Sequence, residues 1–162
     1  MQDQSQQEVL ATVQASTGRR VLGIGLMCAL AVMVIYVAIK TPPALGWQIF
    51  LVVMGAGSLM VANEMRKSTA SVLELTQDEL RDTSGTVLVR LEDVVSIDRG
   101  AFAFKPSNGF LLRLSKPYPR GWRPGLWWRG GKRVGVGGMT PGRQTKYMSD
   151  IIAVMLAERE QG

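Results

Sequence analysis

Two long stretches without charge dominate the first half of the chain. Between residues 21 and 63 the only charged side chain is Lys40, which separates two continuous apolar runs. A helix rises about 1.5 Å per residue, so a run of about 20 residues matches a hydrocarbon core about 30 Å thick. The pattern predicts transmembrane helices over about residues 20–40 and 43–64, which form a hairpin over residues 20–64.

A short connection with two prolines joins the apolar runs. Pro42 and Pro43 stop the first helix, because proline lacks the amide hydrogen that a helix needs, and Pro43 also suits the first turn of the second helix. A pair of buried core helices is the alternative, but two such runs are too much apolar helix for a small domain. A cleaved signal peptide is disfavoured, because Asp3 and Glu8 precede the first run.

The basic residues beside the two runs predict their orientation. Two arginines precede the first run and a basic pair follows the second, whereas the connection carries one lysine: Arg19, Arg20, Arg66, Lys67 and Lys40. Cytoplasmic flanks of membrane spans hold an excess of Lys and Arg. We therefore expect a protein integral to a bacterial inner membrane, with its N- and C-termini in the cytoplasm.

The interior of the spans holds small residues and no ionisable group. Small residues recur in both runs: Gly25, Ala29, Gly55, Gly57, Ser58 and Ala62. Such residues let helices approach closely, either within the hairpin or against another membrane protein. The lack of an ionisable residue at mid-membrane disfavours a pump, a channel or a proton relay.

Residues 1–19 form a polar segment that is rich in glutamine. Val9, Leu10 and Val13 could mark one face of a short helix. Chain ends without strong patterning are usually poorly ordered, so we interpret this segment as a mobile N-terminal tail.

The hydrophobic pattern changes from continuous to alternating after the second run. Apolar side chains at every second position predict half-buried strands around residues 87–91, 95–97, 102–104 and 110–114. Short strands with short turns imply an antiparallel meander that curls into a sandwich or partial barrel. Residues 70–160 are therefore expected to form a β domain, and the whole chain belongs to the α+β class.

Helical spacing returns at the end of this domain. Thr140 is the predicted N-cap and Pro141 the predicted first helical residue. An apolar stripe follows at helical spacing: Met148, Ile151, Ile152, Met155 and Leu156. We expect this stripe to cover the open end of the curled sheet.

Four segments carry a resemblance to a known group of proteins: VLELTQDELRD, VRLEDVVSIDRG, FAFKPSNGFLLRL and TKYMSDIIAVMLAER. Antiparallel strands closed by one C-terminal amphipathic helix are the architecture of pleckstrin-homology (PH) domains. The chain resembles bacterial membrane-anchored PH-like proteins, which commonly place a transmembrane hairpin before such a domain. The resemblance covers about residues 73–159 and implies a cytoplasmic PH-like β domain, but a fold does not fix an activity.

The composition of the 162-residue chain argues against an enzyme. The chain has no histidine, which is the commonest general base and metal ligand, and its one cysteine, Cys28, lies inside the first apolar run. Two acidic pairs are interpreted as solvated turn residues: Asp78-Glu79 and Glu92-Asp93. The glycines of residues 130–138 match neither a phosphate loop nor a dinucleotide-binding turn. We expect no catalytic residue, no metal and no cofactor.

Positive charge is concentrated in the second half of the chain. The formal net charge is +6, yet residues 99–149 contain no Asp or Glu. The densest part is residues 115–133, whose prolines and glycines favour a loop over a long regular strand. This segment supplies the candidate binding surface: Lys116, Arg120, Trp122, Arg123, Trp127, Trp128, Arg129, Lys132 and Arg133.

Three interpretations of this basic, tryptophan-bearing segment remain open. It could lie on the membrane surface, where tryptophan prefers the headgroup level and basic residues attract anionic lipid. It could be a solvated basic face with its tryptophans packed on the domain, or a protein docking site, since Trp and Arg are enriched at interface hot spots. Nucleic acid is disfavoured, because the domain is tethered to a membrane and no recognition motif is present.

Two functional hypotheses follow from these patterns. The first is a non-catalytic, membrane-anchored binding module whose basic surface contacts anionic lipid or a membrane-bound partner. The alternative is an accessory or assembly subunit of a larger inner-membrane complex, in which the hairpin packs on other transmembrane helices or on a second copy of the chain.

Overall fold

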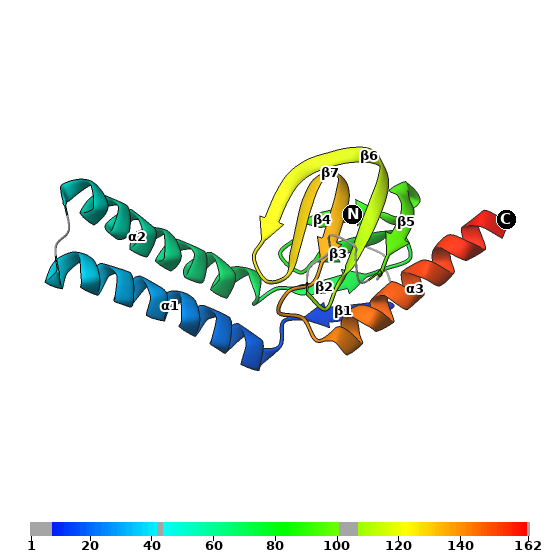
Figure 1. Ribbon diagram of the computed structural model, residues 1–162. Helices are drawn as coiled ribbons and strands as arrows, with labels where there is room; N and C mark the ends of the chain where they lie inside the picture. The colour runs from blue at the N-terminus through cyan, green and yellow to red at the C-terminus, as the bar shows by residue number, and fades with distance from the viewer. Residues whose placement is uncertain (1–7, 42–43, 101–106, 162) are drawn as a thin grey trace, which may run out of the picture.

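The computed structural model describes residues 8–41, 44–100 and 107–161, and it consists of two long helices that project from a small α+β domain (Figure 1). In chain order the elements are β1 (Ala11–Gln14), α1 (Thr17–Lys40), α2 (Leu45–Ser68), β2 (Val72–Leu75), β3 (Glu79–Asp82), β4 (Val87–Arg90), a short 3-10 helix (Leu91–Asp93), β5 (Val94–Asp98), β6 (Phe110–Arg123), β7 (Trp127–Val136) and α3 (Gly142–Gln161).

Helices α1 and α2 are the two apolar helices that the sequence predicts, each a few residues longer than expected. Both are long and apolar enough to cross a membrane. They differ from the core helices of a soluble domain because their large apolar side chains face outward; Leu22, Met33 and Trp47 are each more than half exposed. This arrangement supports membrane association. The prolines predicted to end the first helix, Pro42 and Pro43, lie outside the described residues.

Small residues hold the two long helices together. The buried positions inside the apolar runs are all small: Ala31, Ala38, Gly55 and Ala62. A Cβ atom at Gly55 would lie 2.5 Å from Cγ1 of Ile35, so a larger residue there would force Ile35 to move. Gln48, the polar side chain within the second run, donates from Nε2 to the backbone oxygen of Ala38 at 3.1 Å. This polar side chain is thus satisfied between the two helices.

The prediction of a mobile tail over residues 1–19 is wrong for the part of that segment next to the first span. Strand β1 pairs antiparallel with β2, with Val13 opposite Leu73 and Ala11 opposite Leu75. Val13 is fully buried, and the alternation of buried and exposed positions along β1 is the period of a strand. Residues 1–7 lie outside the described part of the chain.

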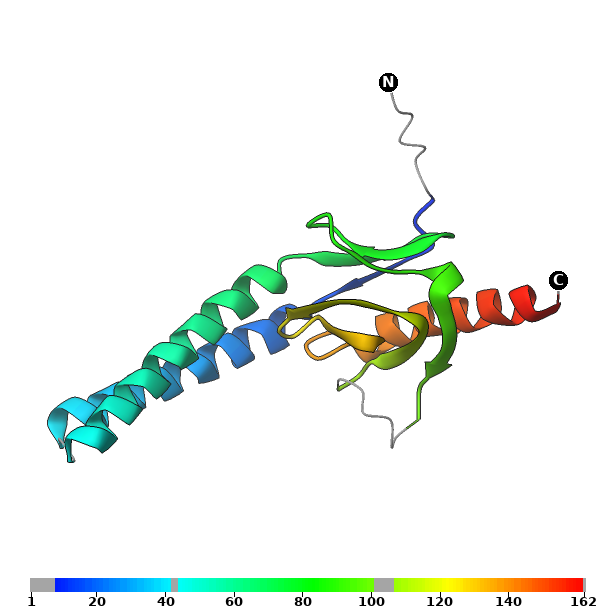
Figure 2. The ribbon, with the colours of Figure 1, turned by 90° about the horizontal axis from the view of Figure 1, so that it is seen from above.

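Strand β1 changes the architecture, because its partner lies on the other side of the helical hairpin. Helices α1 and α2 are inserted between two neighbouring strands of one sheet, so the chain leaves the sheet at Gln14 and returns to it at Val72. Figure 2 shows both helices running out from this edge of the domain. The predicted order, hairpin first and domain second, therefore omits the first strand of the domain.

Two antiparallel sheets and one helix enclose the core. The four-stranded sheet has the order β1-β2-β3-β4 and the three-stranded sheet the order β5-β6-β7. Helix α3 covers the core with Met148 and Ile152, as the apolar stripe predicts. The α+β class is confirmed. The strand expected at Phe102 and Phe104 falls outside the described residues.

The predicted cap of α3 is wrong. The helix begins at Gly142, and the Pro141 oxygen accepts hydrogen bonds from the amides of Gln144 and Thr145, so Pro141 occupies the N-cap position. Thr140 lies one residue too early to cap the helix, and its buried Oγ1 has no hydrogen-bond partner among the described residues.

The expected loop over residues 115–133 is also wrong, since most of this segment belongs to strands β6 and β7. The pairing of β6 with β7 shifts register between Arg113 and Tyr118 and again between Tyr118 and Gly121. Proline is tolerated at such irregularities because they interrupt the ladder of backbone hydrogen bonds. Pro117 and Pro119 lie in these two intervals, and the long strand β6 arches over β7 (Figure 1).

Candidate functional site

The β6–β7 hairpin has two faces with different residues. Near its turn, Trp122 lies opposite Trp128, and Arg123 lies opposite Trp127. Successive residues of a strand point to opposite faces, so the adjacent tryptophans Trp127 and Trp128 cannot share a surface. Trp127 is 3% exposed and Trp122 is 61% exposed. Trp122 and Trp128 therefore mark the outer face of the hairpin.

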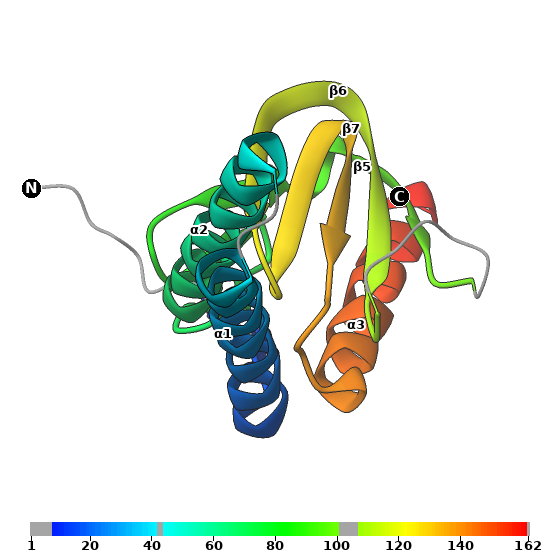
Figure 3. The same ribbon diagram turned by 60° about the vertical axis from the view of Figure 1, so that its left-hand side comes forward.

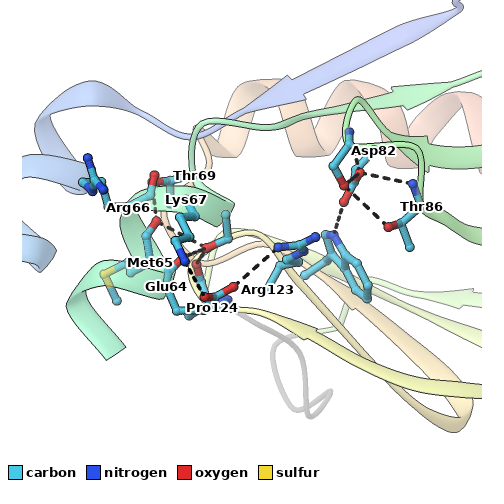
Figure 4. A network of polar contacts seen from close by, with 12 residues as sticks. Glu64, Met65, Arg66, Lys67, Thr69, Asp82, Thr86, Arg123 and Pro124 are labelled. Atoms are coloured by element: carbon cyan, nitrogen blue, oxygen red, sulfur yellow. Dashed lines mark hydrogen bonds and ion pairs between the residues drawn. The ribbon is translucent and has the colours of Figure 1, made fainter. Parts of the chain in front are cut away.

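Trp127 belongs to the core and not to a binding surface. Its Nε1 donates to Oδ2 of the buried Asp82 at 3.2 Å, and the other carboxylate oxygen of Asp82 accepts from the Thr86 amide at 3.4 Å (Figure 4). A Cβ atom at Gly121 would lie 2.9 Å from the Trp127 ring, so the glycine makes room for it. The buried carboxylate and the indole N–H satisfy each other.

Arg129 also has a structural role, because its guanidinium joins the two sheets. Nη1 donates to the backbone oxygens of Val87 and Leu88 at 2.8 Å each, and Nε donates to the Pro119 oxygen at 2.6 Å. The guanidinium lies over the Tyr118 ring, 5.7 Å from its centroid. Burial lowers the pKa of Arg129. Its donors complete the open edge of β4 and are not directed toward an external anion.

Lys116 is held in a cluster with Asp93 and Tyr118. The Tyr118 hydroxyl donates to Oδ2 of Asp93 at 2.5 Å, and the Lys116 Nζ lies 2.9 Å from the same oxygen. These two hydrogen bonds lower the pKa of Asp93, and the bond to Asp93 raises the pKa of Lys116. Burial, followed by the bond to Asp93, raises the pKa of Tyr118. The cluster ties the irregular middle of β6 to the 3-10 helix.

The turn of the β6–β7 hairpin is fastened to the end of α2. Ser68 at the helix end donates from Oγ to the Pro124 oxygen at 2.8 Å, in a buried contact. Nη1 of Arg123 lies 3.5 Å from Oε1 of Glu64 (Figure 4). Gly125, with a φ of 82°, packs beside Thr69. This group of contacts is called the α2 clamp below.

Helix α1 is fastened to the domain in the same region. The Ser16 amide donates to the Met139 oxygen at 2.8 Å, just before α1 begins. A Cβ atom at Gly23 would lie 2.2 Å from Cε of Met139, so the methionine packs directly on the helix backbone. Both spans therefore meet the domain through packed contacts within one or two turns of the apolar runs, and no long linker separates them.

Five of the nine predicted surface residues carry no structural contact of the kind just described. They are Arg120, Trp122, Trp128, Lys132 and Arg133, called the outer hairpin surface from here on; Trp128 is half-buried and the others are exposed. All five lie on the paired strands β6 and β7. The other four, Lys116, Arg123, Trp127 and Arg129, are engaged by Asp93, Glu64, Asp82 and backbone oxygens.

Sequence reasoning missed the residues that engage those four side chains. Asp82 ends β3 and Asp93 ends the 3-10 helix, and nothing local marks them as partners of Trp127 or Lys116. The interpretation of Asp93 as a solvated turn residue is wrong, because Asp93 is buried. Glu64 carried one signal, since it is the first acidic residue after the second span and is followed by a basic pair. In the described part of the chain, no three His, Cys, Asp or Glu side chains gather as a metal site requires.

The comparisons with known proteins found nothing similar to the chain. No protein-family model matches it, and no match was found among curated proteins or solved structures. The α+β arrangement rests on the structure alone, and the resemblance to membrane-anchored PH-like proteins stays a prediction.

Proposed function

We propose that this protein is a non-catalytic, membrane-anchored binding module. Its outer hairpin surface contacts anionic lipid or a membrane-bound partner at the cytoplasmic face of a bacterial inner membrane. One observation carries the proposal: the two apolar helices are inserted between paired strands β1 and β2 and are fastened to the domain at both ends. A domain attached in this way stays at the bilayer, with its basic surface beside it.

The arrangement of basic residues supports a cytoplasmic domain. Arg20 donates from Nη2 to the Arg66 oxygen at 3.3 Å, so the basic ends of the two spans lie side by side. Lys and Arg at this end and a single lysine at the other follow the positive-inside pattern. The inner membrane and the cytoplasmic side of both termini are part of the proposal.

The succession of strands and one final helix supports a PH-like fold within the same proposal. Antiparallel strands followed by one C-terminal helix are the arrangement that the resemblance implies, and the two sheets and α3 have this arrangement. Under this proposal the membrane hairpin is an insertion after the first strand of the PH-like domain. The fold carries no activity by itself, and the proposed function rests on the position and charge of the outer hairpin surface.

Charge gives the outer hairpin surface its preference for anionic lipid. Each basic residue near an anionic leaflet contributes about 1 kcal/mol. Arg120, Lys132 and Arg133 are exposed. Residues 99–149 contain no acidic side chain that would offset this charge from within the same segment. The surface therefore favours negatively charged headgroups over neutral ones.

The test isolates the full chain from membranes in an amphipathic polymer that keeps native lipids around it. The lipids and proteins in these discs are then quantified by mass spectrometry. We expect anionic lipid in excess over the bulk membrane, and a decrease of up to roughly fivefold per charge in the variant Arg120→Gln with Lys132→Gln.

A matched control removes two exposed charges from α3, Arg143→Gln with Lys146→Gln, and should leave the excess unchanged. Equal lipid composition in discs of the unmodified chain and in the bulk membrane, with no protein partner retained, would contradict the proposed function.

A second candidate function, an accessory subunit of a larger membrane complex, has one observation in its favour. A Cβ atom at Gly25 or Gly57 would meet no described atom within 4 Å, so these glycines are not used by packing inside the hairpin. Close approach of another helix would use them. Recovery of one other membrane protein in stoichiometric amount, without anionic lipid excess, would favour this candidate.

A further inference from the structure

We infer that the end of the β6–β7 hairpin is a third point of membrane contact, besides the two spans, and that Trp122 inserts its ring among the lipid headgroups there. The inference rests on the proposed function, since it requires the domain to lie at the bilayer. It goes further by naming lipid as what covers this surface and by naming the side chain that enters the leaflet.

The α2 clamp sets the height of Trp122 relative to the membrane. Pro124 accepts from Ser68, and Arg123 pairs with Glu64 one turn earlier in α2. Trp122 is the residue before Arg123, so it lies at the level where α2 leaves its apolar run. Tryptophan prefers this level because its ring is apolar and its indole N–H needs a polar partner.

The hairpin lies on the side of the domain from which α2 leaves. In Figure 3 the spans come toward the viewer, and β6 and β7 lie beside α2 with no other described element drawn across them. The inner face points to the core, where Trp127 is buried. Trp122 and its cross-strand partner Trp128 are therefore on the face away from the core, on a hairpin that lies beside the end of α2.

Charge complementarity identifies lipid as what covers this surface. Arg66 and Lys67 at the end of α2 are exposed, as is Arg120, two residues before Trp122 on the same strand. The one carboxylate in the α2 clamp, Glu64, is paired with Lys67 at 4.0 Å and with Arg123 at 3.5 Å. An exposed tryptophan on the same strand as the exposed Arg120 suits anionic headgroups over an apolar interior.

Depth measurement by electron paramagnetic resonance tests the inference on the full chain in bilayer discs. The chain has one cysteine, so Cys28→Ser gives a background for placing single spin labels. Labels replace Trp122, Trp47 as a reference for the interface beside the helical turn, and Val154 as a reference for water on α3. Val154 is 56% exposed, and Trp47 and Trp122 are also exposed, so none of these changes removes a core side chain.

The expected result is that the label at position 122 collides with oxygen more than with a water-soluble nickel complex, as the label at 47 does, while the label at 154 shows the reverse. A label at 122 that is as accessible to nickel as the label at 154 would overturn the inference. A label at 122 shielded from both reagents would also overturn it, because protein would then cover the surface.

The measurement is made in discs of neutral lipid and in discs with anionic lipid, so that the two proposals fail separately. Insertion at position 122 in both kinds of disc, without anionic excess in native discs, would contradict the proposed charge preference and keep the third contact. Anionic excess with a water-exposed label at 122 would contradict the third contact alone.

Discussion

The protein contains two hairpins, one of helices and one of strands, and they differ in which side chains they bury and which they expose. The helical hairpin closes on small residues such as Ala31 and Gly55 and directs its large apolar side chains outward. The β6–β7 hairpin buries one face against the core, where Trp127 and Arg129 find polar partners, and exposes Trp122 on the other.

The difference follows from the surroundings that each hairpin suits. Helices satisfy their own backbone groups, so a helical hairpin can present an apolar surface to hydrocarbon on all sides. A β-hairpin needs partners for the backbone groups that its own ladder does not pair, and here Arg129 donates to the Pro119 oxygen of β6. The helical hairpin is suited to the bilayer interior, and the β-hairpin has one face for the core and one exposed face.

The largest effect is expected from breaking the buried face of the β-hairpin. Trp127→Ala should lower the free energy of unfolding by about 3–5 kcal/mol, because it opens a cavity and leaves the Asp82 carboxylate without its indole donor. Trp122→Ala, on the outer face, should change it by less than about 0.5 kcal/mol. Thermal unfolding of the purified protein in detergent measures both. Equal losses would show that the two faces are not distinct.

A smaller effect is expected from overfilling the helical hairpin. Gly55→Leu should destabilise the packing of α1 on α2 by about 1–3 kcal/mol, since its Cβ alone would lie 2.5 Å from Ile35. Gly57→Leu is the matched control, because a Cβ there meets no described atom within 4 Å. The rate of alkylation of Cys28 in detergent reports opening of the helix pair. The same rate in both variants would contradict the role of Gly55.

Removal of the guanidinium that joins the sheets should cost about 1–2 kcal/mol. Arg129→Gln leaves the Val87, Leu88 and Pro119 oxygens with fewer donors, and unmet acceptors carry a desolvation cost. Arg133→Gln, an exposed arginine on the same strand, should have little effect on unfolding. Urea titration followed by circular dichroism compares them. A similar midpoint for Arg129→Gln and Arg133→Gln would show that the inter-sheet hydrogen bonds add no stability.

The smallest effect concerns the pH dependence from Asp93. The lowered pKa of this carboxyl in the folded state makes its stabilisation present above the unfolded value of about 3.9 and lost as pH falls through the folded value. Melting temperatures between pH 7 and pH 3 should therefore fall more steeply for the unmodified protein than for Asp93→Asn. Parallel curves would contradict a role for the Asp93 cluster.

The raised pKa of Lys116 predicts how the stability of the same cluster changes at high pH. Its raised pKa means that its contribution is present below the unfolded value of about 10.4 and is lost as pH rises through the higher folded value.

Features with long local patterns could be predicted from the sequence. The two spans follow from continuous apolar runs, and α3 follows from a stripe whose spacing repeats over several turns. These signals lie within one element, so no distant partner is needed to recognise them. The α+β class followed from the same reasoning.

Features that depend on distant partners could not be predicted. Strand β1 has four residues, and its partner β2 begins more than fifty residues later, on the other side of the spans. The alternation of apolar and polar residues in β1 is too short to be distinguished from a polar loop until β2 is placed beside it. The prolines of β6 are tolerated because they lie where its pairing with β7 shifts register. Sequence composition does not reveal such shifts.

The residues of the candidate surface could be predicted from the sequence, but their division into buried and exposed groups could not. The nine basic and aromatic residues stand out by composition, but their division into two groups requires the strand assignment. Once residues 127–136 are known to form a strand, period two alone separates Trp127 from Trp128. The partners that engage Lys116, Arg123 and Arg129 come from other elements and require the fold itself.

A disulfide between strands β1 and β2 tests the central claim most directly. The claim is that the two spans are inserted between these paired strands and hold the domain at the bilayer. Thr12 and Glu74 are directly opposite on β1 and β2. Facing residues on paired strands have Cα atoms about 4.5–5.5 Å apart, within the range of a disulfide.

In the Cys28→Ser background, Thr12→Cys with Glu74→Cys should form an intramolecular disulfide on mild oxidation in membranes. Thr12→Cys with Arg81→Cys should not, because Arg81 lies opposite Glu74 on the next strand and is too far from β1. A disulfide in the first pair alone is the predicted result. No disulfide in either pair, or equal yields in both, would contradict the insertion of the spans between β1 and β2.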